Sequence, residues 1–276
     1  MSSLAEWNIP RLNGTSAPLT LSPSETAIFV GANGTGKSAL SHWLRKHVPH
    51  GASIVHIRAH RKLWLTSPGP DTTPSNYATY SSILAQEDLK PASRHKDARA
   101  DQRSAGILFR LLSAENERNF RVSRLATGDS LPEELEPSPL DRITDLLQAA
   151  GLGLTFHVGK SMSFEVERQG HRYPIDQMSD GEKAAFLLAT EVLLADANSV
   201  IILDEPERHL HRSISGRLII QIVAERPDCA FVAFTHDLDL TDRLRHKSTS
   251  TTVVRSVKWN GPNPLGWDLE ELPPQA

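Results

Sequence analysis

The feature that most constrains this chain is the run Gly31–Ser38, which follows a short apolar segment and precedes a helix-like one. The run reads GANGTGKS and fills every fixed position of the pattern GxxxxGK[ST]. The apolar segment Thr26–Val30 suits a strand that is buried on both faces, and Lys37–His47 suits a helix. Glycines let backbone N–H groups curl around phosphate oxygens, and a helix N-terminus adds partial positive charge. The sequence therefore predicts a phosphate-binding loop between a strand and a helix.

The residue types in this loop predict individual roles. Lys37 is expected to reach the β- and γ-phosphates of a nucleotide, and Ser38 is expected to ligate Mg²⁺. A chance glycine turn is the alternative, and the complete motif in its strand–loop–helix context argues against it. The other expected nucleotide-binding positions are Gly31, Asn33, Gly34, Thr35 and Gly36.

A second group of polar residues follows the apolar segment Val200–Leu203 (VIIL). Ligands bind at the carboxyl ends of the strands in an open parallel sheet, which is where Asp204 and Glu205 would stand. Asp204 is expected to hold Mg²⁺ directly or through water, and Glu205 is expected to act as general base on the attacking water. A strand that ends in a solvated acidic turn is the alternative, and the phosphate loop makes it the weaker one.

Two further segments carry a family resemblance. The text Met178–Glu182 (MSDGE) opens a helix-like run, and His236 follows the apolar segment Ala230–Phe234. The SDGE text resembles the signature motif of the ATP-binding cassette (ABC) ATPases, in the SxGE form of their non-transporter branch. The resemblance implies that Ser179 and Gly181 of one subunit cap the γ-phosphate held by the other, and that His236 senses this phosphate. On the residues alone, Ser179 is also an ordinary helix N-cap.

The text Asp204–His211 (DEPERHLH) narrows the resemblance. It is similar to ATPases of the overcoming-lysogenization-defect class and their anti-phage relatives, although Arg212 stands where those proteins commonly have proline. The resemblance implies ATP with Mg²⁺, an ATP-sandwich dimer or higher oligomer, and a separate effector such as a TOPRIM-type nuclease in bacterial anti-phage defence. His209 and His211 suit a dimer interface or the family's D-loop better than a metal site, because no third ligand cluster accompanies them.

Strands alternate with helices at both ends of the chain, which indicates an α/β fold with a mostly parallel sheet. Together with the resemblance, this predicts a P-loop NTPase core of the ABC ATPase type. We expect a single domain, 1–276, with a helical insertion at about 66–140. Within it, Thr66–Tyr80 reads as a loop and Ser81–Arg124 as helical. An antiparallel β portion is expected at Leu154–Val158 and Ser163–Arg168.

Charge and composition bound the partners of this chain. Thirty Lys and Arg against 33 Asp and Glu give a net charge of −3 over 276 residues, which argues against a uniformly basic nucleic-acid binder. The segment Lys90–Arg124 is locally basic, so it is either a nucleic-acid contact or a solvated helical face. The single cysteine, Cys229, excludes an internal disulfide and fits a reducing cytosol. With no apolar run of about 20 residues, we expect a cytoplasmic protein without direct membrane insertion.

Three other functions stay open at this stage. They are a DNA-repair or chromosome-type ATPase that clamps DNA, the ATPase subunit of a transporter, and a nucleotide-binding scaffold with little turnover. Two family positions also stay open. The Q-loop glutamine is Gln86 or Gln102, unless the residues after the strand at 54–57 serve that region, and Trp7 is either the adenine-stacking aromatic or a core residue.

Overall fold

The computed structural model describes residues 3–58, 65–94, 99–126, 137–159, 161–245 and 249–273. The chain forms two compact units. The first unit comprises Met1–Arg61, Gln86–Ala98 and Ala195–Ala276, and the second comprises Lys62–Ala85 and Arg99–Leu194. Each unit is described below by itself.

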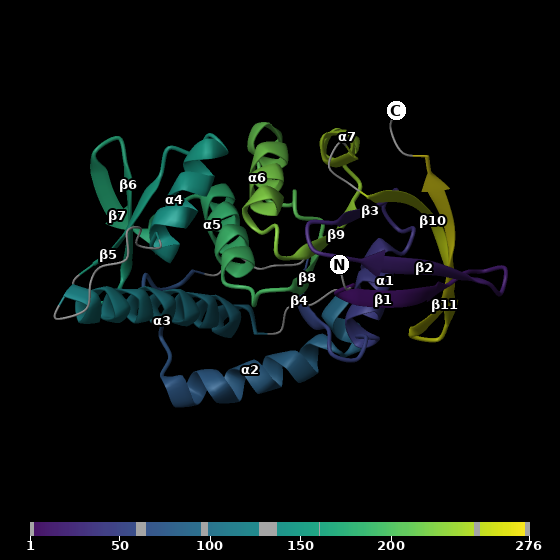
Figure 1. Cartoon of the computed structure of the whole chain (residues 1–276), viewed down its shortest axis with the longest axis horizontal. Coiled ribbons are helices and arrows are strands. Elements are labelled where there is room, and N and C mark those ends of the chain that lie inside the picture. The colour runs from purple at the N-terminus through teal and green to yellow at the C-terminus, as the bar shows by residue number, and fades with distance from the viewer. Residues whose placement is uncertain are drawn as a thin grey trace. The chain divides into compact units, whose positions relative to one another are not determined.

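The first unit is built on a six-stranded sheet (Figure 1) in the order β11-β10-β3-β9-β8-β4. Only the pair β10–β11 is antiparallel, and the four other neighbouring pairs are parallel. The expected α/β class with a mostly parallel sheet is therefore confirmed. The strands are β3 (Thr26–Val30), β4 (Ser53–Ile57), β8 (Ser199–Asp204), β9 (Ala230–Thr235), β10 (Ser250–Asn260) and β11 (Asn263–Leu272).

The central strands β3, β8 and β9 are buried at every position, as their continuous apolar text predicts. A separate antiparallel hairpin of β1 (Ala5–Pro10) and β2 (Ser16–Leu21) alternates buried and exposed residues, so one of its faces joins the same core. Trp7 on β1 belongs to that core, where only 4% of its surface is exposed and its Nε1 donates to the carbonyl of Leu44 at 3.3 Å. A core role for Trp7 is therefore the one the structure supports.

Helices complete the first unit. Helix α1 contacts β8 and β9, and α7 contacts β3 and β9. The helix predicted after the phosphate loop is confirmed as α1, and the text from Arg212 to Glu225, which also predicts a helix, forms α6. The bounds are α1 (Lys37–Lys46), the 3-10 turn η1 (Pro91–Arg94), α6 (Arg212–Glu225) and α7 (Leu238–Arg245).

The second unit combines helices with a small antiparallel sheet in the order β5-β6-β7. This confirms the expected antiparallel portion and adds the strand β7, which the sequence did not predict. Helix α5 contacts both α3 and α4 (Figure 1). The elements are α3 (Ala100–Ala126), α4 (Pro139–Ala149), β5 (Thr155–Val158), β6 (Phe164–Arg168), β7 (His171–Pro174), the 3-10 turn η2 (Ile175–Gln177) and α5 (Asp180–Leu193).

The loop expected over Thr66–Tyr80 is wrong in its second half, because helix α2 (Pro74–Asp88) begins there. Proline is favoured at the first position of a helix, where its missing N–H is not needed. The Thr73 hydroxyl accepts from the backbone N–H of Asn76 at 3.3 Å and so caps the helix. The Tyr77 ring then packs on Phe109 at 4.9 Å between centroids, a tertiary contact that no local pattern indicates.

The long strand β10 is another element that the sequence did not indicate. It pairs with β3 over Ser250–Val253 on one side and with β11 over Thr251–Asn260 on the other, with two register irregularities. Its burial pattern does not alternate. The acidic, proline-bearing text Asp129–Pro139 predicts a link after the helical insertion, and its first eight residues, 129–136, lie outside the described residues. Among the described residues, no helix is both long and apolar enough to cross a membrane.

Candidate functional site

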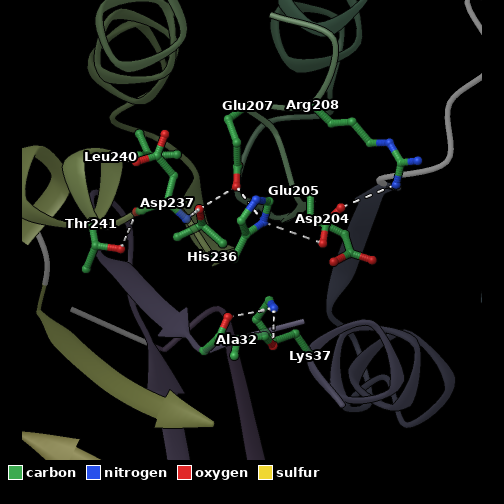
Figure 2. A network of polar contacts seen from close by, with 12 residues as sticks. Ala32, Lys37, Asp204, Glu205, Glu207, Arg208, His236, Asp237, Leu240 and Thr241 are labelled. Carbon is green, nitrogen blue, oxygen red and sulfur yellow. Dashed lines mark hydrogen bonds and ion pairs between the residues drawn. The ribbon is translucent and has the colours of Figure 1, made fainter. Parts of the chain in front are cut away.

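Three neighbouring strands of the first unit end at one edge of the sheet. Strand β9 lies between β3 and β8, and the register pairs Val30 with Thr235 and Asp204 with Phe234. The phosphate loop follows β3, the acidic pair follows β8, and His236 follows β9. Because parallel strands in this register end at the same level, the three predicted groups come together (Figure 2).

Lys37 is held over its own loop. Its ammonium donates to the carbonyl of Gly31 at 2.8 Å and to that of Ala32 at 3.0 Å (Figure 2). Only 4% of the Lys37 surface is exposed. Burial lowers the pKa of this lysine, while the carboxylates of Glu205, Asp204 and Glu207 act to raise it. The loop thus presents one cation to a space that several carboxylates share.

Glycine is required where α1 begins. Gly36 has φ of +97°, a left-handed conformation, and a Cβ there would lie 2.5 Å from Cγ1 of Val257. Its carbonyl also accepts from Nε1 of the buried Trp267 at 3.1 Å. At the other end of the loop, a Cβ on Gly31 would lie 2.4 Å from the carbonyl oxygen of Val254. Strand β10 therefore confines the backbone of the loop, whose Asn33 and Gly34 remain exposed.

Asp204 and Ser38, the two residues expected to ligate Mg²⁺, lie within hydrogen-bond distance of each other. The Ser38 hydroxyl donates to Oδ1 of Asp204 at 3.3 Å. Asp204 is buried, and this burial raises the pKa of its carboxyl to about 7; the nearby Glu205 also raises it, whereas the Ser38 hydrogen bond and Lys37 lower it. Carboxylate and hydroxyl oxygens are ligands that Mg²⁺ prefers. The positive charge near the buried Asp204 carboxylate does not offset the effect of its burial, so a bound cation would stabilise its charged form. Asp204 and Ser38 therefore suit Mg²⁺.

Glu205 adopts an unusual backbone conformation. Its φ is +46°, which is uncommon for a residue with a side chain, and its N–H donates to the carbonyl of Phe234 at 2.8 Å. The carboxylate lies 3.4 Å from the guanidinium of Arg208 and 3.7 Å from Nδ1 of His236. Backbone strain of this kind concentrates at functional sites, where surrounding contacts maintain it.

Glu207 also belongs to this site, although the sequence predictions assigned it no role. Its Oε1 accepts from the Thr235 hydroxyl at 2.6 Å and lies 3.5 Å from Nδ1 of His236. The text DEPE already contains this glutamate, but nothing local indicates that it faces the end of β9. Glu205, Glu207 and His236 line an open hollow. The other lining residues are Asn33, Arg208, Arg212, Ser215, Asp237, Leu238 and Asp239.

The signature-like text lies in the second unit, at the start of α5. Ser179 caps the helix: its hydroxyl accepts from the N–H of Glu182 at 3.4 Å, and the Glu182 carboxylate accepts from the N–H of Ser179 at 2.9 Å. Ser179 is exposed and Gly181 is half-buried. Ser179 is therefore a helix N-cap, as the residues alone predicted. The N-terminus of α5, which would bind an anion, is open to solvent.

The structure also places His211, Gln86 and Gln102, which the sequence analysis named as candidates. His211 caps α6, because its Nδ1 accepts from the N–H of Ser213 at 3.3 Å. Within the described part of the chain, no cluster of three His, Cys, Asp or Glu side chains is arranged to hold a metal ion. Gln86 is exposed on α2, and Gln102 accepts from Arg99 at 3.0 Å. Both assignments of the Q-loop glutamine stay predictions.

The basic segment Lys90–Arg124 is shared by the two units, which divide between Ala98 and Arg99. Several of its cations have partners within their own unit. Lys90 pairs with Glu87, and Arg110 donates to the carbonyl of Leu194. The segment is therefore not one continuous surface of a single unit.

Comparisons with known proteins give one family and several similar structures. A family model described as "AAA domain, putative AbiEii toxin, Type IV TA system" matches residues 57–242, which is more than half of the chain. None of the curated proteins matches the sequence.

Solved structures resemble the chain at low identity. The SMC head bound to the C-terminal winged-helix domain of ScpA is 14% identical, with 99% of each chain covered and a TM-score of 0.47. CbiO1 of Clostridium perfringens, part of the ABC transporter complex CbiONQ, is 16% identical, with 94% of this chain and 86% of that chain covered and a TM-score of 0.38. Similarity at this level says nothing about ligands or partners.

The confinement of Gly36 predicts a stability difference between two glycines. Gly36→Ala should lower the free energy of unfolding by roughly 1–3 kcal/mol more than Gly14→Ala. Both positions have positive φ, but only at Gly36 would the Cβ meet another residue, since nothing lies within 4 Å of a Cβ on Gly14. Urea denaturation of both variants measures the difference, and equal losses would contradict the collision with Val257.

The buried Asp204 predicts a pH-dependent stability. The pKa of this carboxyl is about 7 in the folded chain and near the ordinary aspartate value of 3.8 in the unfolded chain, so folding binds a proton and the free energy of unfolding falls as pH rises between these values. Asp204→Asn removes this penalty and should stabilise the metal-free protein at pH 8, by at most about 4 kcal/mol, but not at pH 4. Urea denaturation in EDTA at both pH values checks this. The exposed Asp268→Asn serves as control, and an equal gain from Asp204→Asn at both pH values would contradict the cause.

Proposed function

The chain belongs to the family of AAA domains described as putative AbiEii toxins of type IV toxin–antitoxin systems, and on that premise we propose that it couples ATP hydrolysis between two copies of itself to the control of a partner. The expected P-loop ATPase of the ABC type and the expected enzyme class, an ATPase, are confirmed by this membership together with the sheet. The observation that carries the proposal is the phosphate loop beside a carboxylate-tipped strand, with Ser38 donating to Asp204 at 3.3 Å.

ATP is proposed to bind with its phosphates on the loop that follows β3. Backbone N–H groups between Gly31 and Gly36 and the start of α1 would donate to the phosphate oxygens. Lys37, now bonded to loop carbonyls, would neutralise charge on the β- and γ-phosphates. Ser38 and Asp204 would hold Mg²⁺, which when bound offsets the negative charge that builds up on the phosphates.

Hydrolysis then needs a base and a donor near the γ-phosphate. Glu205 would take a proton from water as the water oxygen attacks phosphorus and the bond from phosphorus to the bridging oxygen breaks, giving ADP and phosphate. His236 would donate to an oxygen of the γ-phosphate. Glu205 and His236 both line the hollow beside the loop, and Oε1 of Glu205 lies 3.7 Å from Nδ1 of His236.

We assign the second half of the site to another copy of the chain. Ser179 and Gly181 stand at an exposed helix N-terminus, which suits an approach to a γ-phosphate held by a second subunit. In such a head-to-tail dimer, ATP would join two copies and hydrolysis would separate them, and the two units of the chain would act as one ATPase domain.

The partner is proposed to be a separate effector protein, such as a TOPRIM-type nuclease, in bacterial anti-phage defence. Support comes from the DEPERHLH text and from the family description, which names a putative toxin. A toxin acts on something outside its own chain, which agrees with an ATPase that controls another protein. The proposal places the protein in the bacterial cytoplasm.

The roles of Lys37 and Glu205 give a first prediction. Lys37→Ala should abolish ATP binding, whereas Glu205→Gln should keep binding and lower the hydrolysis rate by roughly 10²–10⁴-fold, the usual contribution of a general base. Phosphate release and fluorescent-nucleotide binding measure the two effects. If Glu205→Gln hydrolyses ATP as fast as the wild type, the assignment of Glu205 is wrong.

The head-to-tail arrangement predicts complementation between two inactive variants. Gly181→Asp adds a carboxylate in the first turn of α5, where it is compatible with the helix but repels phosphate. Alone, Lys37→Ala and Gly181→Asp should both be inactive. Mixed in equal amounts, half of the dimers should contain one intact composite site, so about a quarter of the wild-type rate should return. A mixture that stays inactive would count against action in trans.

A further inference from the structure

We propose that Glu207 is a positioning residue for His236. The buried carboxylate of Glu207 holds Nδ1 of the His236 ring, and Nε2 of the same ring is left to face the phosphate. The proposal rests on the function proposed above for His236. It adds a residue that neither the motifs nor the family resemblance assigned.

The geometry around His236 carries the argument. Figure 2 shows its ring between the carboxylates of Glu207 and Glu205, and Nδ1 lies 3.5 Å from Oε1 of Glu207 and 3.7 Å from Oε1 of Glu205. The ring nitrogen that faces two acceptors must carry a proton, and Nε2 must carry one as well to donate to a phosphate oxygen, so the proposed role requires the doubly protonated ring. A rotation that exchanged the ring's edges would remove this proton from both carboxylates, so the pair opposes it.

The Glu207 side chain is itself held in place by Thr235. The Thr235 hydroxyl donates to Oε1 of Glu207 at 2.6 Å and also accepts from the N–H of Asp237 at 2.9 Å. Thr235 and Asp237 flank His236 directly in the chain. The carboxylate is thus anchored to the same turn that carries the imidazole, and the two side chains keep a fixed relation.

The burial of the Glu207 carboxylate would destabilise the fold if this side chain served only to fill space. The Glu207 side chain is 9% exposed, and its Oε2 has no hydrogen-bond partner among the described residues. Burial raises the pKa of this carboxyl, although the Thr235 hydroxyl and His236 act against the shift. Burying a charge with an unsatisfied oxygen destabilises a fold unless the charge serves a partner, and His236 is the group beside it.

Glu205 cannot hold His236 by itself. Its carboxylate also lies 3.4 Å from the guanidinium of Arg208, and the proposed mechanism uses it to accept a proton from water. A second carboxylate that does not contact the attacking water keeps the histidine oriented while Glu205 is engaged with that water. Two neighbouring acids in different surroundings can thus take different roles, with Glu205 as the base and Glu207 as the residue that positions His236.

The test combines kinetics with a spectroscopic readout of His236. Glu207→Gln keeps the shape of the side chain and removes its charge. We expect it to lower kcat roughly 10-fold to 100-fold, with KM for ATP within about twofold of the wild type. In protein labelled with ¹⁵N-histidine, the His236 ring signals, assigned by their loss in His236→Gln, should shift in Glu207→Gln even without nucleotide. Glu6→Gln, at an exposed position of β1, should change neither measurement.

A matched pair at Thr235 keeps the proposal falsifiable if Glu207→Gln folds poorly. Thr235→Ser retains the hydroxyl and should leave kcat and the His236 signals near those of the wild type, whereas Thr235→Val should reproduce the defect. Unshifted His236 signals in Glu207→Gln, or a loss confined to KM, would overturn the proposal. If the wild type does not hydrolyse ATP, the proposed function fails, and the ring signals still decide whether Glu207 orients His236.

Discussion

Negative charge gathered around one buried lysine is the constraint on which the rest of this site depends. Asp204, Glu205 and Glu207 all act on the pKa of Lys37, and Asp204 is buried deeply enough for its own pKa to rise to about 7. Carboxylates this close and this poorly solvated repel one another. They coexist because each has a separate neighbour: Ser38 for Asp204, Arg208 for Glu205 and Thr235 for Glu207.

This arrangement follows from the sheet. Strand β9 lies between β3 and β8 in a register that brings their three carboxyl ends to one level. The loop after β3 is further confined by β10 and β11, through Val257 at Gly36 and the indole of Trp267. The strands that close the sheet on this side therefore shape the phosphate loop, even though no motif residue lies on them.

Much of the fold and of the site could be predicted from local patterns. The continuous apolar text of β3, β8 and β9 predicted buried parallel strands, and the positions after them predicted the polar groups that meet at the sheet edge. Prediction was weaker where tertiary contacts decide. The sequence predicts a loop where the first half of α2 lies, although Tyr77 packs on Phe109 there, and it does not predict β10, whose burial does not alternate.

By itself, the sequence determined the chemical groups of the site, because the spacing of a phosphate loop and of a carboxylate after an apolar strand is local information. It also indicated which side chains would carry a proton or hold a metal. Only the tertiary structure decided that Glu207 faces His236 at 3.5 Å and that Thr235 anchors it. That contact joins the turns after β8 and β9, and two strands become neighbours only through the packing of the whole sheet.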